Sequence, residues 1–224
     1  MEIGLLKYPN KSHRKTVTLP RNSVGLAEFM GVMAGDGEIS NQWQARISMS
    51  VFVDEPYSNY LKLQINKLFN LDPRITVRKN ENTILITCNS TSLVDYLVNK
   101  GMTRGNKIVG GINIPDWVTG NKPYEIAFVR GLVDTDGCLY IHKHKVNNKT
   151  YNNIGFCFAN SAKGLLDSVY NILLKNDIKP TLNHSNTHIY LYKVESVVKY
   201  LSIFGSSNPR IFQKYEKWRD HIEA

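Results

Sequence analysis

The strongest constraint on the fold of this chain is an internal repeat. Residues 28–40 read EFMGVMAGDGEIS and residues 127–139 read AFVRGLVDTDGCL, and an offset of 100 residues superposes an internal glycine and the Asp-Gly pair. Three later segments match in the same order: 71–73 with 178–180, 82–83 with 186–187, and 92–97 with 196–201. Ordered matches along the whole chain identify two copies of one unit of about 85 residues.

The two copies predict a two-part organisation. We expect a first repeat over 22–103, a linker over 104–121, and a second repeat over 122–224 that ends in a helical tail. Apolar spacing predicts helices over 23–35, 55–69, 91–99, 123–135, 162–175 and 195–203. Alternating runs predict strands over 45–52 and 153–160, and each copy adds a hairpin before its last helix. The connections between paired strands are too short for parallel crossovers, so the fold class is α+β, with two αββαββα repeats and antiparallel sheets.

Charge and composition restrict the possible partners. The chain of 224 residues carries 28 Lys plus Arg against 19 Asp plus Glu, a net charge of +9, which favours an anionic partner such as nucleic acid. The three cysteines form an odd set within apolar runs, as in reduced core thiols. No apolar run reaches the roughly 18–20 residues of a membrane span, so we expect a soluble intracellular protein of the cytoplasm, nucleoid or an organelle matrix.

The matched helices bring two carboxylates together. Gly31 and Gly131 lie inside helices, where glycine costs about 1 kcal/mol, and close packing of the two helices through them would compensate. Asp36 and Asp136 would then lie side by side at the base of the interface. Neighbouring carboxylates repel unless a cation accompanies them, and Mg²⁺ favours such hard oxygen ligands. Each Asp-Gly pair alone could be a simple helix stop, but its duplication favours a paired site.

The duplicated segments resemble a known family. FMGVMAGDG (29–37) and VRGLVDTDG (129–137) are similar to the paired motif of the LAGLIDADG homing endonucleases in their single-chain form. IPDWV (114–118) and SSNPRIFQKYEKW (206–218) are similar to further segments of that family. The resemblance implies repeats packed through the motif helices and sheets that form a DNA-binding saddle. It also implies a monomer that binds a long target in double-stranded DNA, without an obligate protein partner or a membrane.

The resemblance assigns the residues of the cutting site. The catalytic acids and metal ligands fall on Asp36 and Asp136, and Gly35 and Thr135 would supply backbone carbonyls to the metal. It implies two or three divalent ions, Mg²⁺ with Mn²⁺ able to substitute. Hydrolysis across the minor groove would leave short 3′ overhangs, in the service of intron homing.

The sequence departs from the family pattern beside these acids. The sixth motif letter, usually acidic, is Ala34 in the first copy and Asp134 in the second. The polar or basic residue that the family often places near the start of the second helix, beside the metals, has only a poor match in either copy. Asn160 and Lys193 are the candidates that the sequence offers.

Strand alternation predicts the DNA-binding side chains, because successive residues point to opposite faces of a sheet. Arg, Gln and Asn on such a face suit readout of base edges in the major groove. The predicted DNA-binding set is Glu38, Ser40, Gln42, Gln44, Arg46, Ser48, Ser50, Arg74, Thr76, Arg78, Tyr140, His142, His144, Asn153 and Gly155.

Other functions stay open at this point. A non-cleaving nucleic-acid binder on the same scaffold, either an RNA maturase or a transcription regulator, would usually lack one acid, and both are present. A structural interaction module leaves the basic charge and the paired acids unexplained. A zinc cluster of cysteines and histidines (138, 142, 144, 157 and 188) has ligand spacing that fits no known site well.

Overall fold

The computed structural model describes residues 2–3, 15–147 and 149–223. Its two central helices are α1 (Val24–Gly35) and α5 (Lys122–Asp136), as the sequence predicts. The Ser23 side chain caps α1 by accepting a backbone hydrogen bond of 3.2 Å, and the Asn121 side chain caps α5 in the same way. These caps satisfy backbone N–H groups that have no partner within the helix, which fixes where each helix starts.

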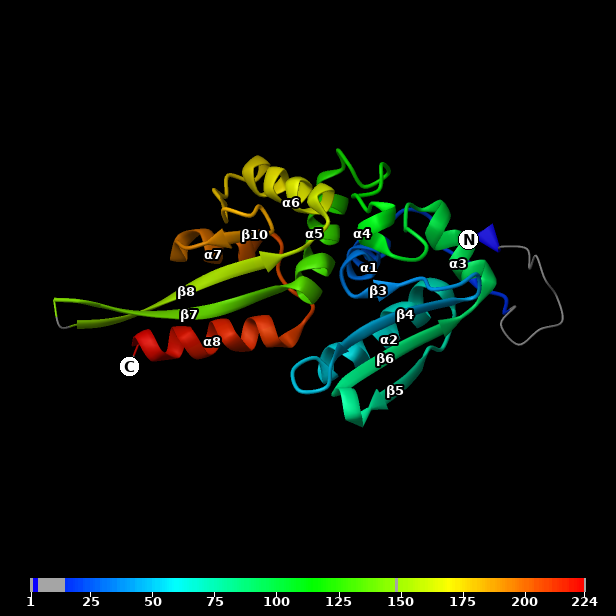
Figure 1. The fold of residues 1–224 in the computed structure, drawn as a ribbon, viewed down its shortest axis with the longest axis horizontal. Helices are drawn as coiled ribbons and strands as arrows, with labels where there is room; N and C mark the ends of the chain where they lie inside the picture. Colours follow the sequence, from blue (N-terminus) through cyan, green and yellow to red (C-terminus); the bar gives the residue numbers. More distant parts are fainter. Residues whose placement is uncertain (1, 4–14, 148, 224) are drawn as a thin grey trace.

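The described residues form two four-stranded antiparallel sheets of equivalent order, one on each side of the central helix pair (Figure 1). The first has the order β3-β4-β6-β5, with strands β3 (Gly37–Glu38), β4 (Gln44–Ser50), β5 (Arg74–Arg78) and β6 (Thr83–Asn89). The second has the order β7-β8-β10-β9, with strands β7 (Gly137–Val146), β8 (Lys149–Ala159), β9 (Thr181–Leu182) and β10 (His188–Leu191). The predicted α+β class with pseudo-symmetric repeats is confirmed.

Amphipathic helices cover one face of each sheet. They are α2 (Glu55–Phe69) and α3 (Thr91–Asn99) in the first repeat, and α6 (Lys163–Lys175) and α7 (Val194–Ile203) in the second. Along β4 buried and partly exposed residues alternate strictly, so one face packs on the core and the other faces away. The remaining elements are the short strands β1 (Glu2–Ile3) and β2 (Thr18–Leu19), a 3₁₀ turn η1 (Lys79–Glu81), and α4 (Lys107–Gly110) in the linker.

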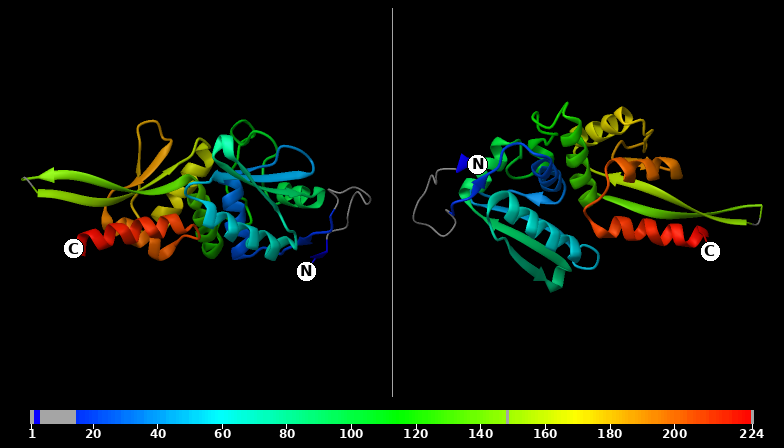
Figure 2. Two further views of the ribbon diagram at one scale, coloured as in Figure 1. Left: turned by 90° about the horizontal axis from the view of Figure 1, so that it is seen from below. Right: turned by 180° about the vertical axis from the view of Figure 1, so that it is seen from behind.

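The second repeat reaches further than the first. Its β7–β8 hairpin is longer than the predicted strand and projects beyond the helices of that repeat (Figures 1 and 2). The C-terminal helix α8 (Pro209–Glu223) lies along it, and the Trp218 indole donates a 2.7 Å hydrogen bond to the backbone carbonyl of Asn152. This contact supports the hairpin on one face.

Main-chain contacts join α1 to α5. A Cβ atom added to Gly31 would lie 2.1 Å from the Phe128 carbonyl oxygen, and one added to Gly131 would lie 2.1 Å from the Glu28 carbonyl oxygen. The two glycines therefore allow a backbone approach that any side chain would block. The close packing inferred from the sequence is confirmed.

Replacing Gly31 tests this contact. We expect Gly31→Ala to lower the free energy of unfolding by at least roughly 2 kcal/mol, because overpacking against rigid backbone outweighs the gain in helix propensity. Gly25→Ala in the same helix is the matched control, since its added Cβ would meet only Leu68 Cδ2 at 3.9 Å. Urea denaturation measures both, and equal stability of the two variants would contradict the backbone contact.

Candidate active site

Asp36 and Asp136 lie at the ends of the joined helices, immediately before β3 and β7. A Cβ atom on Gly35 would lie 3.0 Å from Asp136 Oδ1, so the carboxylate of one repeat reaches the last turn of the other repeat's helix. The two predicted catalytic acids are therefore brought together.

Burial raises the free energy needed to ionise either carboxylate. Desolvation, followed by repulsion from Asp136, raises the pKa of Asp36 from 3.8 to about 7. Desolvation also raises the pKa of Asp136, although a 2.6 Å hydrogen bond from Asn160 Nδ2 to Asp136 Oδ2 opposes this rise. Two such carboxylates attract a cation, because a positive charge between them relieves both the repulsion and the desolvation.

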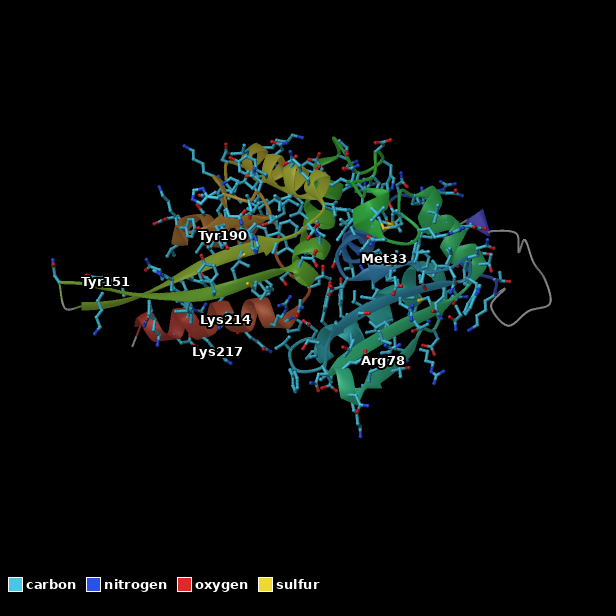
Figure 3. The ribbon with its side chains drawn as sticks, in the orientation of Figure 1. Met33, Arg78, Tyr151, Tyr190, Lys214 and Lys217 are labelled. Atoms are coloured by element: carbon cyan, nitrogen blue, oxygen red, sulfur yellow. The ribbon has the colours of Figure 1, made fainter. Side chains whose placement is uncertain are left out.

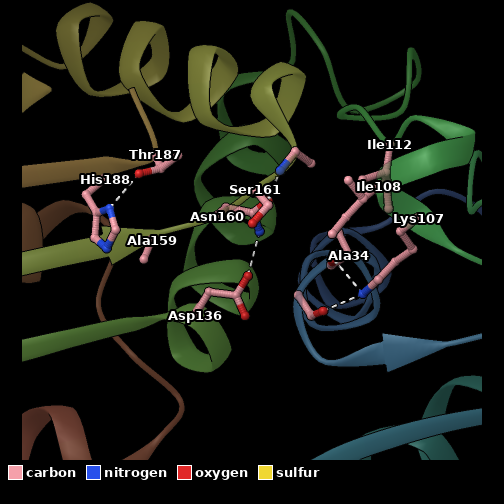
Figure 4. A pocket seen from close by; sticks show the side chains of 12 residues that line it. Ala34, Lys107, Ile108, Ile112, Asp136, Ala159, Asn160, Ser161, Thr187 and His188 are labelled. Atoms are coloured by element: carbon pink, nitrogen blue, oxygen red, sulfur yellow. Dashed lines mark hydrogen bonds between the residues drawn. The ribbon is translucent and has the colours of Figure 1, made fainter. Parts of the chain in front are cut away.

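Lys107 in α4 supplies a positive charge that the sequence analysis missed. Its Nζ donates to the carbonyl oxygens of Ala34, at 2.9 Å, and Gly35 at the C-terminal end of α1, where the helix dipole favours a cation (Figure 4). Burial lowers the pKa of Lys107, while Asp136 and then Asp36 oppose that effect. The sequence contains only a weak indication of this role, because Lys107 is one of only two basic residues in the linker at 104–121.

Arg210 in α8 plays the equivalent part at the end of α5. Its Nη2 donates to the carbonyl oxygens of Asp134 at 3.0 Å and Thr135 at 3.1 Å, and its Nε forms a 3.0 Å ion pair with Asp54 Oδ1. Asp54 precedes α2 in the first repeat, so this arginine also connects the two halves. A basic side chain thus contacts each backbone carbonyl that the resemblance assigns to the metal, Gly35 and Thr135.

A cavity of about 330 Å³ opens beside Asp136. Asn160, Lys107 and His188 contribute to its wall, and the His188 ring contacts Thr187 Oγ1 at 2.8 Å (Figure 4). The prediction that Asn160 lies near the acids agrees with this geometry. Lys193 instead lies exposed before α7 and does not line the cavity.

The sixth motif position, Ala34 in the first copy and Asp134 in the second, also differs in its contacts. Asp134 is 1% exposed and accepts hydrogen bonds from the Ser206 hydroxyl and, at 2.8 Å, from the Ser207 backbone. Burial raises the pKa of Asp134 to about 7. Ala34, its counterpart in α1, is also buried and needs no such partner. Asp134 therefore anchors the segment that leads into α8.

In the first sheet, the predicted DNA-binding residues share the face turned away from the helices, apart from those in the loop after β3. Arg46 forms a 3.3 Å ion pair with Glu38 and a 3.2 Å hydrogen bond with Ser40, and the Gln44 amide donates to Asn89 at 2.9 Å. Gln42 is exposed in that loop. The other members lie on β4 and β5: Ser48, Ser50, Arg74, Thr76 and Arg78.

In the second sheet, Tyr140, His142 and Asn153 lie on the corresponding outer face. A Cβ atom on Gly155 would lie 2.5 Å from Tyr140 Cζ, so the tyrosine ring covers this glycine. The backbone of His144 lies in β7, but its side chain is outside the part that the structure describes. Within the described residues, no group of three His, Cys, Asp or Glu side chains could hold a metal ion, so the zinc alternative has no site there.

Known proteins share this architecture. Residues 123–215 match the family profile described as a LAGLIDADG-like domain. The crystal structure of I-DmoI in complex with DNA and Ca is similar with a TM-score of 0.56 and 18% identity, covering 88% of this chain and 100% of that one. The I-LtrWI LAGLIDADG homing endonuclease bound to target DNA gives a TM-score of 0.59 at 10% identity, covering 89% and 90%.

Two curated relatives are much longer than the matched segments. The replication factor C small subunit of Methanocaldococcus jannaschii is 30% identical over 158 residues, which are 63% of this chain and 8% of that protein. The ribonucleoside-diphosphate reductase NrdEB subunit alpha of Bacillus subtilis is 28% identical over 133 residues, 54% of this chain and 12% of that protein.

Fold and site together define a pseudo-symmetric two-repeat protein with paired carboxylates between two antiparallel sheets. Its fold is that of the LAGLIDADG homing endonucleases, and its second repeat contains a LAGLIDADG-like domain, which confirms the resemblance seen in the sequence. Among the described residues no helix is long and apolar enough to cross a membrane.

The raised pKa of Asp36 predicts a pH-dependent stability. Between pH 3.8 and about 7 the native state binds more protons than the unfolded chain, so stability falls as pH rises through this window. We expect Asp36→Asn to raise the free energy of unfolding at about pH 8 by up to roughly 4 kcal/mol, at about 1.4 kcal/mol per pKa unit, and to give no such gain below about pH 4.

Urea denaturation across this pH range measures the effect. Asp72→Asn is the matched control, because that carboxylate is 73% exposed in a surface ion pair with Lys62. A gain for Asp36→Asn that is the same at every pH would contradict a buried charge as its cause.

Proposed function

We propose that this protein is a divalent-metal-dependent endonuclease that cuts a specific site in double-stranded DNA. The observation that carries the proposal is the meeting of Asp36 and Asp136 at the base of α1 and α5, between two sheets. The similar folds of proteins crystallised with DNA, and the net charge of +9, support a DNA partner.

The chemistry of the site fits a hard divalent cation. Asp36 and Asp136 present carboxylate oxygens in a buried setting where ionisation of both is costly, and Mg²⁺ is often held by one or two carboxylates plus substrate phosphates. Such a cation, when bound, supplies Lewis acidity for water activation and for charge on the leaving oxygen. Asp36 and Asp136 would hold Mg²⁺ or Mn²⁺, with the Gly35 and Thr135 carbonyls beside them.

The side chains around the acids have separate roles. Lys107 donates to the last carbonyls of α1 and can offer its ammonium group to a phosphate oxygen as negative charge develops. Asn160 fixes the orientation of the Asp136 carboxylate through its 2.6 Å hydrogen bond. Arg210 holds the end of α5 and the start of α2 in one arrangement.

The family resemblance implies the finer features, and the two-fold arrangement is compatible with them. The two sheets would contact the major groove on either side of the cutting site, while the acids face two phosphates on opposite strands across the minor groove. Cuts at two such phosphates leave short 3′ overhangs. Because one chain contains both halves, a monomer is sufficient, and intron homing is the biological role that the resemblance implies.

The relatives support a separable module. Matches that span only 8% and 12% of two otherwise unrelated proteins are expected for a domain inserted in longer chains. The alternative function is a non-cleaving nucleic-acid binder, an RNA maturase or a transcription regulator. The presence of both acids favours the nuclease.

Sequencing the ends of cut DNA tests the proposal directly. The protein is incubated with a randomised duplex library in Mg²⁺, with Ca²⁺ as a control for binding. Recurrent Mg²⁺-dependent cuts with a constant stagger would support the nuclease and give its target. Retention of selected DNA without any cut would favour the binder, and a flat salt response of binding would count against any nucleic-acid partner.

Removing the two acids should separate cutting from binding. We expect the double variant Asp36→Asn, Asp136→Asn to lose at least roughly 10³-fold in cutting rate, since the cation loses its charged ligands, while DNA affinity changes by less than about threefold. Gel-shift titration in Ca²⁺ and cleavage in Mg²⁺ measure the two quantities. Loss of binding together with cutting would point to a structural role of the acids.

The substitutions Lys107→Gln and Lys193→Gln form a matched pair of variants. We expect Lys107→Gln to slow cutting by roughly 10²–10³-fold, the usual effect of removing one donor at a developing oxyanion, with little change in DNA affinity. Lys193→Gln should cut at the normal rate, because Lys193 is exposed and outside the cavity. Equal rates for both variants would remove Lys107 from the proposed site.

A further inference from the structure

The two repeats connect their first two sheet strands differently at one equivalent position. In the first repeat, the residue two positions after the acid is Glu38, which lies directly opposite Arg46 and forms a 3.3 Å ion pair with it. In the second repeat, the same position is Cys138, which lies directly opposite Cys157. Two thiols therefore stand where the first repeat has an ion pair between strands.

The three cysteines differ in exposure. All are free; Cys88 is buried, Cys157 is half-buried and Cys138 is exposed. The expectation of core thiols from the sequence thus holds only for Cys88, which lies on β6 of the first sheet. Cys138 lies on β7, an edge strand of the second sheet, and is the thiol that a dissolved reagent reaches most easily.

Cys157 lies between two strands of the second sheet. Strand β8 pairs with β7 on one side and with β10 on the other, where the residue opposite Cys157 is Tyr190 (Figure 3). The neighbouring pairs Gly137–Phe158 and Leu139–Phe156 hold β7 and β8 in register on either side of the two cysteines. The fold therefore keeps the two thiols opposite each other.

This register meets the distance requirement of a disulfide. Residues directly opposite on antiparallel strands have Cα atoms roughly 4.5–5.5 Å apart, and their side chains share one face of the sheet. Disulfides join cysteines whose Cα atoms are about 4.4–6.8 Å apart. The strands therefore need not slide or separate for a bond between Cys138 and Cys157 to form.

We propose that Cys138 and Cys157 are a redox modification site, which forms a reversible disulfide by exchange with a small-molecule disulfide such as oxidised glutathione. The Cys138 sulfur first attacks one sulfur of the reagent, whose S–S bond breaks and releases one glutathione. The Cys157 sulfur then attacks the Cys138 sulfur of the mixed disulfide and releases the second glutathione. Two electrons pass from the cysteines to the reagent, and the two thiol protons leave with the two glutathione molecules.

The order of the two steps follows from exposure and register. Cys138 meets the reagent first because it is exposed, and Cys157 completes the bond because it is held opposite, which makes its attack intramolecular. Exposed disulfides are the ones that cellular thiols reduce readily, so the bond is reversible. The chemistry needs neither DNA binding nor cutting, so this proposal and the proposed function can fail separately.

Mass spectrometry tests the proposal on the folded chain. The protein is incubated with oxidised glutathione, its remaining thiols are alkylated in urea, and it is digested without reduction. We expect the protein to lose two hydrogen atoms, to keep Cys88 as its one alkylated thiol, and to give a peptide pair joined through Cys138 and Cys157. Dithiothreitol should restore all three thiols. Absence of the joined pair, or a joined pair that contains Cys88, would overturn the proposal.

Single substitutions test the order of the steps. Cys157→Ser should accumulate a mixed disulfide of glutathione with Cys138, because the second step is lost. Cys138→Ser should react at least roughly tenfold more slowly, because its remaining thiol on this sheet is less exposed. Cys88→Ala is the matched control and should form the same disulfide as the wild-type protein. Equal accumulation of the mixed disulfide in wild type and in Cys157→Ser would contradict a resolving role for Cys157.

Unfolding tests the contribution of the fold. In Cys88→Ala, which can form only one intramolecular disulfide, the equilibrium constant against glutathione is measured with and without urea. We expect it to be at least roughly tenfold larger for the folded chain, because strand pairing raises the effective concentration of one thiol at the other. Equal constants in the two conditions would overturn the proposal.

Discussion

The contact between the backbones of α1 and α5 determines the rest of the structure. Gly31 and Gly131 each lie against a carbonyl oxygen of the opposite helix, at a distance that excludes any side chain. This contact brings the ends of the two helices together, and Asp36 and Asp136 follow those ends directly. It also places a sheet on each side of the acids, so the two sheet faces and the paired carboxylates are arranged about one axis.

The site balances unfavourable charge with cations from the chain itself. Two buried carboxylates lie close to the carbonyl ends of two helices, where negative charge and the helix dipoles add. Lys107 and Arg210 offset this accumulation, one at each helix end. Both come from segments outside the αββαββα unit, so the linker and the C-terminal helix complete a site that neither repeat forms alone.

The sequence predicted what depends on periodicity and repetition. The helices over 55–69 and 91–99, the helix pair and the positions of the two acids were all evident, because apolar spacing and a duplicated motif specify them. Lys107 could not be predicted, since its role depends on a short loop folding back onto α1, and no local pattern records that path. The cover of Tyr140 over Gly155 was missed for a related reason: alternation gives the face of a side chain but not its direction across neighbouring strands.

The backbone contact between α1 and α5 has an evolutionary consequence. The packing of α1 on α5 depends on the absence of a side chain at Gly31 and Gly131, and not on a set of complementary side chains. Few residues must therefore be kept to preserve this packing. Residues on the outer faces of the two sheets can then change independently in each half while the angle between the halves stays fixed. The residue that pairs with the second position after the acid is Arg46 in the first sheet and Cys157 in the second, which is the kind of divergence that this backbone contact permits after a gene duplication.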